Sequence, residues 1–280
     1  MTAILLATDL SPYGDRALDR AAMLAAERGA SLTLVHVVSR DLMSGERHAA
    51  AVAAAERSLR EYAEDAALPD GLALATLARG GEAGPEIAQA ARETGSELVV
   101  MAAPHADLLV QLFRSSVLNH VVRHALCPVL VVRGRARRGW RRVLVAVDLS
   151  QPSRLALETA LRLRPDAEMA EMALTVVHAH SAGAVGMAAE EKTRVDDMLS
   201  ASLARLAAEG RTAPGSVTIV SEPGKPEAVV PAVAARVRAE LAVVGTLGLT
   251  GAANLLLGST AEALLASLGC DVLAVRPKEG

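Results

Sequence analysis

The amino-acid sequence repeats itself. Four segments of the first half recur in the same order in the second half, each offset by 139 to 143 residues. The pairs are ILLATDLSPYGDRALDRAAMLA at 4–25 with VLVAVDLSQPSRLALETALRL at 143–163, SLTLVHVV at 31–38 with ALTVVHAH at 173–180, ARGGEAGPEIAQAARETGSELVVM at 78–101 with SEPGKPEAVVPAVAARVRAELAVV at 221–244, and CPVLVVR at 127–133 with CDVLAVR at 270–276. Such a series indicates two copies of one domain. We expect a first domain at 1–134, a linker at 135–141 and a second domain at 142–280.

Within each copy the hydrophobic pattern alternates between two periods. Short apolar runs rich in Leu and β-branched residues predict buried strands, which in the first copy fall at 4–8, 32–37, 72–77, 98–102 and 129–132. Segments with apolar residues at helical spacing separate them. The alternation predicts an α/β fold with one parallel five-stranded sheet in each copy and helices on both faces. The chain has one Trp, two Tyr and one Phe, so the core must consist of Ala, Val and Leu, which suits buried parallel strands.

Composition excludes several classes of protein. The net charge of −3 gives no field that would attract nucleic acid, and so few aromatic residues leave little on which bases could stack. Cys127 and Cys270 are too far apart in sequence to indicate a disulfide framework or a zinc site. The first residues do not form a signal peptide, so we expect a cytoplasmic protein. The arginine-rich joint at 134–142 fits either a nucleic-acid patch or a solvated linker, and its five scattered arginines favour the linker.

Polar residues and a glycine follow the predicted strands at corresponding places. Asp9 and Asp148 end the first strand of each copy, His36 and His178 end the second, and Gly245 ends the fourth strand of the second copy. The carboxyl ends of parallel strands share one edge of the sheet, and ligands of such folds bind at that edge where the strand order reverses. We therefore expect a ligand site there.

The segment GTLGLTGAANLLLGST at 245–260 has three interpretations. It can be a phosphate-binding loop, a membrane span, or a buried strand with turns. Residues 241–261 carry no charge and are long enough to cross a bilayer. However, this stretch contains five polar side chains and four glycines, and its beginning repeats a strand of the first copy. These features favour a buried strand followed by a ligand loop.

The pattern G-x2-G-x9-G-[ST] after a fourth strand, together with a first-strand Asp followed by Ser, resembles the universal stress protein family. The two copies resemble its tandem members, over about 3–133 and 142–277. The resemblance implies two doubly wound sheets of the HUP (adenine nucleotide α-hydrolase-like) class with strand order 3-2-1-4-5. It also implies that the last strands of the two copies pair within one chain as a pseudo-dimer, and it leaves a further homodimer open.

The resemblance further implies a site for ATP, with or without Mg²⁺, in the second copy. Its residues are Ala146, Asp148, Ala179, Gly245, Gly248, Gly258, Ser259 and Thr260. The chemistry of these residues agrees with that expectation. Glycine lets the backbone approach phosphate oxygens, and the N–H groups that open a helix at 258–260 favour an anion. The hydroxyl groups of Ser259 and Thr260 add donors and can help to cap that helix.

The first copy departs from this pattern. Its segment AAPHADLLVQLFRSSV keeps the spacing but places Ala102, His105 and Ser115 where the second copy has glycines, while Asp9 and Ser116 are retained. Each replacement adds a Cβ where the backbone would approach a ligand. We expect a degenerate site that no longer binds ATP. Because the first copy evidently closes this loop without glycine, we also expect the glycines of the second copy to serve a ligand rather than the turn.

These observations predict a tandem universal stress protein that binds ATP in its second domain and acts as a nucleotide-dependent regulator in a stress response. There is no Walker A motif, no GxSxG and no HExxH, and no side chain is assigned as catalytic, so we expect at most a weak ATPase. His178 and His180 share a strand face but lack further ligands, so no metal site is predicted. The alternative is a scaffold, or a carrier of a small apolar or lipid-like ligand. The alanine-rich segment 46–64 predicts a helix that covers the sheet rather than one that docks a partner.

Overall fold

The computed structural model describes residues 2–12, 14–39, 45–103, 117–163, 166–180, 185–246 and 257–277. The chain forms two compact units, Met1–Arg138 and Gly139–Gly280. The first contains β1 (Ala3–Ala7), α1 (Asp15–Arg28), β2 (Ser31–Val38), α2 (Gly45–Asp65), β3 (Leu74–Gly80), α3 (Ala83–Glu93), β4 (Leu98–Ala102), α5 (Val117–His124) and β5 (Val129–Val132). The second contains β6 (Arg142–Val147), α6 (Gln151–Leu161), α7 (Asp166–Met169), β7 (Ala173–His180), α8 (Val185–Ala208), β8 (Ser216–Pro223), α9 (Pro226–Arg236), β9 (Leu241–Gly245), α10 (Ser259–Ser267) and β10 (Asp271–Val275).

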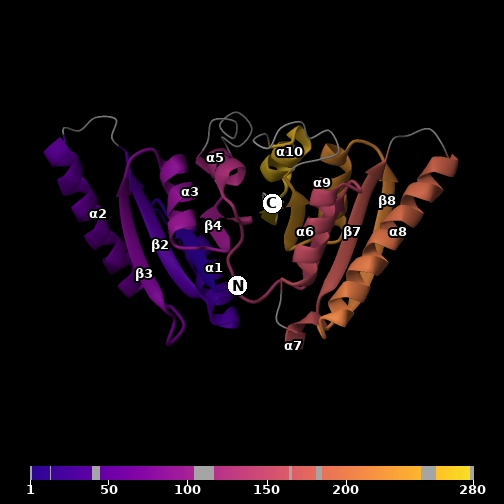
Figure 1. Ribbon diagram of the computed structural model, residues 1–280, viewed down its shortest axis with the longest axis horizontal. Helices are drawn as coiled ribbons and strands as arrows, with labels where there is room; N and C mark the ends of the chain where they lie inside the picture. The colour runs from indigo at the N-terminus through magenta and orange to yellow at the C-terminus, as the bar shows by residue number, and fades with distance from the viewer. Residues whose placement is uncertain are drawn as a thin grey trace. The chain divides into compact units, whose positions relative to one another are not determined.

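Each unit is a parallel sheet with helices on both faces (Figure 1). The strand order is β3-β2-β1-β4-β5 in the first unit and β8-β7-β6-β9-β10 in the second, and every neighbouring pair within a unit is parallel. Both orders are 3-2-1-4-5 in the numbering of one copy, so the predicted topology is confirmed. Right-handed crossovers to opposite sides of the first strand put the helices on opposite faces. In the second unit α9 accordingly packs on α10, and α6 packs on α8.

The core of both sheets consists of Ala, Val and Leu, as the composition requires. The inner strands are buried along most of their length, as β4 and β9 illustrate. Helix α1 presents Ala17, Leu18, Ala21 and Leu24 to the sheet at helical spacing. Among the described residues, none of the helices combines the length and apolar character needed to cross a membrane. Leu241–Gly245 is a strand, so the membrane interpretation of 241–261 is excluded.

Local sequence explains two of the helix ends, and two other positions run against the usual preferences of helices. Ser150 caps α6 by accepting a hydrogen bond from the N–H of Ser153, and Gly29 ends α1 in the left-handed conformation. In contrast, Arg238 adopts a φ of 51° after α9, where glycine is the usual residue. Pro231 lies inside α9 and has no N–H to donate to the carbonyl of Glu227 four residues earlier.

The helix that follows the second strand, α2 in the first unit and α8 in the second, is held by different polar contacts in the two units. In the first, the hydroxyl of Tyr62 in α2 donates to Asp15 Oδ1 in α1 at 2.9 Å. Burial and the neighbouring Asp15 raise the pKa of Tyr62, so the phenol stays a donor.

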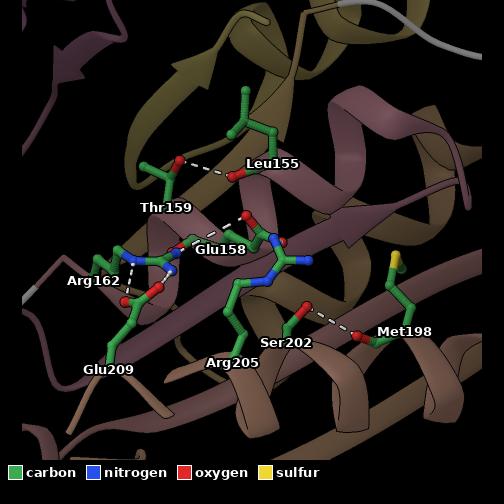
Figure 2. Close-up of polar contacts among 8 residues, drawn as sticks. All are labelled: Leu155, Glu158, Thr159, Arg162, Met198, Ser202, Arg205 and Glu209. Carbon is green, nitrogen blue, oxygen red and sulfur yellow. Dashed lines mark hydrogen bonds and ion pairs between the residues drawn. The ribbon is translucent and has the colours of Figure 1, made fainter. Parts of the chain in front are cut away.

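In the second unit an ionic network ties α8 to α6 (Figure 2). Arg205 donates to Glu158 Oε1 at 2.7 Å, and Arg162 binds both oxygens of Glu209 at 2.5 and 3.1 Å. Arg162 also lies 4.0 Å from Glu158, so all four side chains are linked. The bond to Arg162 lowers the pKa of Glu209.

Two segments differ from the simplest interpretation of their sequence. Helix α2 buries only Leu59 and Ala63, although its first half is rich in alanine. In the arginine-rich joint, Trp140 is 3% exposed and donates to the buried Asp271 Oδ2 at 2.9 Å. The joint thus includes one anchored aromatic residue among its arginines, and this anchor belongs to the second unit.

Candidate functional site

A pocket of about 190 Å³ opens at the carboxyl end of the second sheet. It lies where β6 adjoins β9, which is the point where the strand order reverses and where doubly wound folds bind ligands. The N-terminal ends of α9 and α10 contribute to its wall. The lining residues are Ala146, Val147, Asp148, Ser153, Val177, Ala179, Pro226, Val230, Val244, Gly245, Thr246, Gly258, Ser259, Thr260, Ala261 and Leu264.

The structure gathers the predicted site residues of the second copy in this one pocket. Those that line it are Ala146, Asp148, Ala179, Gly245, Gly258, Ser259 and Thr260. Gly248 lies outside the described residues. Sequence reasoning missed Ser153 and Pro226, because they reach the pocket from α6 and α9, and it missed Thr246, although this residue directly follows Gly245.

Asp148 shapes the turn between β6 and α6. Its Oδ1 accepts hydrogen bonds from the N–H of Ser150 at 3.0 Å and from the hydroxyl of Ser150 at 2.5 Å. Ser153 completes the turn, because its hydroxyl accepts from the N–H of Asp148 at 3.3 Å and donates to Ser150 O at 3.0 Å. Leu149 is held at a φ of 64° between them. This carboxylate therefore has a structural role that requires no ligand.

The same turn occurs in the first unit. Asp9 Oδ1 accepts from the N–H of Ser11 at 3.0 Å, and Leu10 has a φ of 61°. A left-handed leucine costs about 1–2 kcal/mol, and both copies retain it. The retained Asp9 is explained by this turn.

His36 and His178, each two residues before the end of the second strand of its unit, also make matching bonds. The Nδ1 atom of His36 lies 2.9 Å from Thr8 O, and the Nδ1 atom of His178 lies 2.9 Å from Val147 O. Each ring thereby links its strand to the end of the neighbouring strand. The Nε2 atom of the buried His178 lies 3.6 Å from Glu191 Oε2 of α8.

Gly245 is favoured by packing as well as by its place in the loop pattern. A Cβ at this position would lie 3.1 Å from the carbonyl carbon of Pro152 and 3.2 Å from the N atom of Ser153. The first turn of α6 therefore presses on the end of β9. At Gly245 the expectation that glycine serves a ligand alone is too simple, because helix packing supplies a second reason.

The N-terminus of α10 forms the polar end of the pocket. Gly258 is the N-cap and makes no side-chain capping bond, so the first N–H groups of the helix have no side-chain cap. The hydroxyl of Thr260 does not cap the helix. It donates to Glu227 Oε1 of α9 at 2.8 Å.

Unlike the hydroxyl of Thr260, the hydroxyl of Thr246 is buried without a hydrogen-bond partner among the described residues. The residue is 3% exposed and lines the pocket, and among the described residues its Oγ1 has no hydrogen-bond partner. Its backbone is fully used, because its N–H donates to Val275 O and its carbonyl accepts from the N–H of Gly258. A buried hydroxyl without a partner costs free energy unless a ligand or water completes it.

The first unit shows only part of its corresponding segment. Ala102 ends β4 and is half-buried, while His105, Ser115 and Ser116 lie outside the described residues. Further along, the rings of His120 and His124 stack in α5 with centroids 4.0 Å apart. Burial and the neighbouring His124 lower the pKa of His120.

Comparison with known proteins identifies the family. The family model described as "Universal stress protein family" matches residues 1–133 and again 139–276. The chain belongs to the universal stress protein family. The tandem arrangement expected from the internal repeat is thereby confirmed.

Relatives within the universal stress protein family are distant. The chain is 28% identical to the universal stress protein E homolog of Haemophilus influenzae over 200 residues, which are 65% of this chain and 63% of that protein. It is 28% identical to universal stress protein E of Escherichia coli K12 over 197 residues, which are 66% and 62% of the two chains. The match thus spans less than two thirds of either relative.

Solved structures of universal stress proteins share the fold. A universal stress protein from Archaeoglobus fulgidus has a TM-score of 0.70 at 21% identity, with 99% of this chain and 97% of that chain covered. The protein PA1789 from Pseudomonas aeruginosa, described as functionally unknown, has a TM-score of 0.65 at 22% identity, with 99% and 93% covered. These likenesses confirm the α/β fold of two doubly wound sheets.

Proposed function

We propose that the second unit binds an adenine nucleotide, ATP being the form expected from the sequence, in the pocket between β6, β9, α9 and α10. The proposed role is that of a nucleotide-dependent regulator in a stress response. The observation that carries the proposal is the buried, unpartnered hydroxyl of Thr246 in a pocket that ends at a helix N-terminus without a side-chain cap. A bound ligand with polar groups would satisfy both features.

The shape and chemistry of the pocket support this assignment. Its wall is mainly apolar, with side chains such as Val177 and Val230, which suits a flat base. Its polar end offers N–H groups of α10, which favour oxygen atoms of a ribose or phosphate. At about 190 Å³ the described cavity is smaller than the about 300–1,000 Å³ of typical small-molecule sites, so it suits part of a nucleotide.

The described lining residues provide no evident general base, so we expect slow hydrolysis of ATP or none. Among the lining residues that the structure describes, Asp148 is the only one with an acidic or basic side chain. Its Oδ1 already accepts two bonds from Ser150, so it is committed to the turn. A general base has to reach the attacking water within hydrogen-bond distance, and no other carboxylate or histidine lines the described pocket.

The test is calorimetric titration of the purified protein with ATP and with adenosine, together with chromatography of any nucleotide released on denaturation. Thr246→Val removes the unpartnered hydroxyl with little change of shape. If the ligand completes that hydroxyl, affinity should fall about five- to tenfold, the loss of one hydrogen bond of about 1–1.5 kcal/mol.

Ser221→Ala is the matched control. The hydroxyl of Ser221 in β8 is also buried without a partner, but it does not line the pocket. This variant should bind as the wild type does. No measurable binding of either ligand would refute the proposed function, and equal affinity of Thr246→Val and wild type would refute the assignment of the site.

A further inference from the structure

Glu227 is a carboxylate at the polar end of the pocket. It lies in the first turn of α9, and its Oε1 accepts the hydroxyl proton of Thr260, the second residue of α10. The negative charge therefore lies beside the N-terminus of α10, whose partial positive charge it stabilises. Any phosphate that bound to the N–H groups of α10 would have this carboxylate as a neighbour.

Among the lining residues that the structure describes, no basic side chain offsets that charge. Among the described lining residues, Asp148 alone is charged, and it is acidic. Residues 247–256, which connect β9 to the segment before α10, include no charged residue in the sequence. Lys225 precedes α9 as its N-cap but is exposed and is not among the lining residues. Among the described residues, a phosphate group at the N-terminus of α10 would thus have the carboxylate of Glu227 behind Thr260 and no cation in the pocket lining.

The first unit has no acidic residue at the corresponding place. Helices α3 and α9 both run for 11 residues and follow a glycine with positive φ, Gly81 at 156° and Gly224 at 140°. This register puts Gly84 where the second unit has Glu227. A Cβ at Gly84 would lie 2.7 Å from the Cβ of His120, so α5 fills this space instead. The acidic residue is found only in the copy with the intact glycine pattern.

We propose that Glu227 makes the pocket select against phosphate charge. The site then takes adenosine more tightly than free ATP, and it takes ATP well only when a divalent cation such as Mg²⁺ offsets the charge of the phosphates. This inference rests on the proposed nucleotide function and names the residue that sets its charge preference. Glu227 is a specificity-determining residue, because it acts on the ligand through its charge.

The test is calorimetric titration of adenosine and of ATP, in low-salt buffer with EDTA, against wild type and Glu227→Gln. The amide keeps an oxygen that can accept from Thr260 but removes the charge. We expect the variant to bind free ATP about tenfold more tightly, a change of about 1.4 kcal/mol, and to bind adenosine as the wild type does. The gain for ATP should shrink in high salt and in the presence of Mg²⁺.

Thr260→Val separates charge from hydrogen bonding. It removes the bond but leaves the carboxylate, so it should give no gain in affinity for ATP. Three results would overturn the inference while leaving the nucleotide function intact: equal gains for adenosine and ATP in Glu227→Gln, a gain that persists in high salt, or a gain in Thr260→Val. If the wild type binds neither ligand, the proposed function fails and the inference with it.

Discussion

The unpartnered hydroxyl of Thr246 predicts an unusual stability change. Without ligand, this buried donor has no partner among the described residues, and such a group costs about 1–3 kcal/mol relative to an apolar one. Thr246→Val replaces the hydroxyl with a methyl group of similar size, so it opens no cavity. We expect the ligand-free second unit to become more stable by about 1 kcal/mol, although the same change weakens ligand binding.

The chain contains its own probe for this measurement. Trp140 is the single tryptophan in the sequence, and it lies buried in the second unit. Its fluorescence during urea unfolding therefore follows that unit. In thermal unfolding, 1 kcal/mol corresponds to a rise in Tm of about 3–5 °C for a domain of this size.

The opposite sign would refute the reasoning. If Thr246→Val lowers the stability of the ligand-free protein, the hydroxyl has a hydrogen-bond partner in solution, such as an ordered water. The lack of a protein partner would then be no argument for a ligand. Ser221→Ala serves as the reference for a similar hydroxyl outside the pocket. Adding ATP should reduce the difference between wild type and Thr246→Val, because ligand binding stabilises the wild type more.

Three further predictions concern packing, backbone strain and thiol reactivity. Gly245→Ala should destabilise the second unit by about 1–3 kcal/mol in the same fluorescence assay, because its Cβ would press on Pro152; a neutral result would remove the packing argument. Arg238→Gly should stabilise the second unit by about 0.5–1 kcal/mol. Glycine relieves the left-handed strain of about 1–2 kcal/mol, and its larger loss of backbone entropy on folding offsets part of this gain. A loss of stability would show that the arginine side chain contributes more than the strain costs. Burial raises the pKa of the Cys127 thiol to about 11, which leaves about one thiolate in a thousand at pH 8. Mass spectrometry after iodoacetamide treatment should therefore find Cys127 unmodified in the native protein and modified after unfolding. Rapid labelling of the native protein would contradict the burial of this thiol.

The sequence predicted the architecture well because the fold repeats its signals locally. The strands at 98–102 and 129–132 were predicted with their observed bounds, since each is a short run of apolar residues between turn signals. The order of the strands came from the family resemblance, and it is confirmed. The pairing of the two last strands within one chain stays a prediction, as does the boundary of each domain.

The site was only partly predictable, since its chemistry depends on contacts between distant segments. The glycine pattern pointed to Gly245 and Gly258, but nothing in the sequence indicated that α6 presses on Gly245. The bond between Thr260 and Glu227 joins residues 33 positions apart, and nothing in the glycine pattern indicated it. The buried state of Thr246 likewise appears only when β9, β10 and α10 are assembled.

The different polar contacts that hold α2 and α8 affect how the two copies respond to salt. Helix α2 is held by hydrogen bonds from neutral donors: Tyr62 donates to Asp15, and Thr76 and the N–H of Ala78 donate to Glu56. Helix α8 is held by a partly exposed network of charges, which consists of Glu158, Arg162, Arg205 and Glu209. Dissolved ions weaken such a network far more than they weaken a neutral donor's bond. The two copies therefore share a fold but differ in sensitivity to ionic strength, and a rise in salt concentration should weaken the contacts that hold α8 before it weakens those that hold α2.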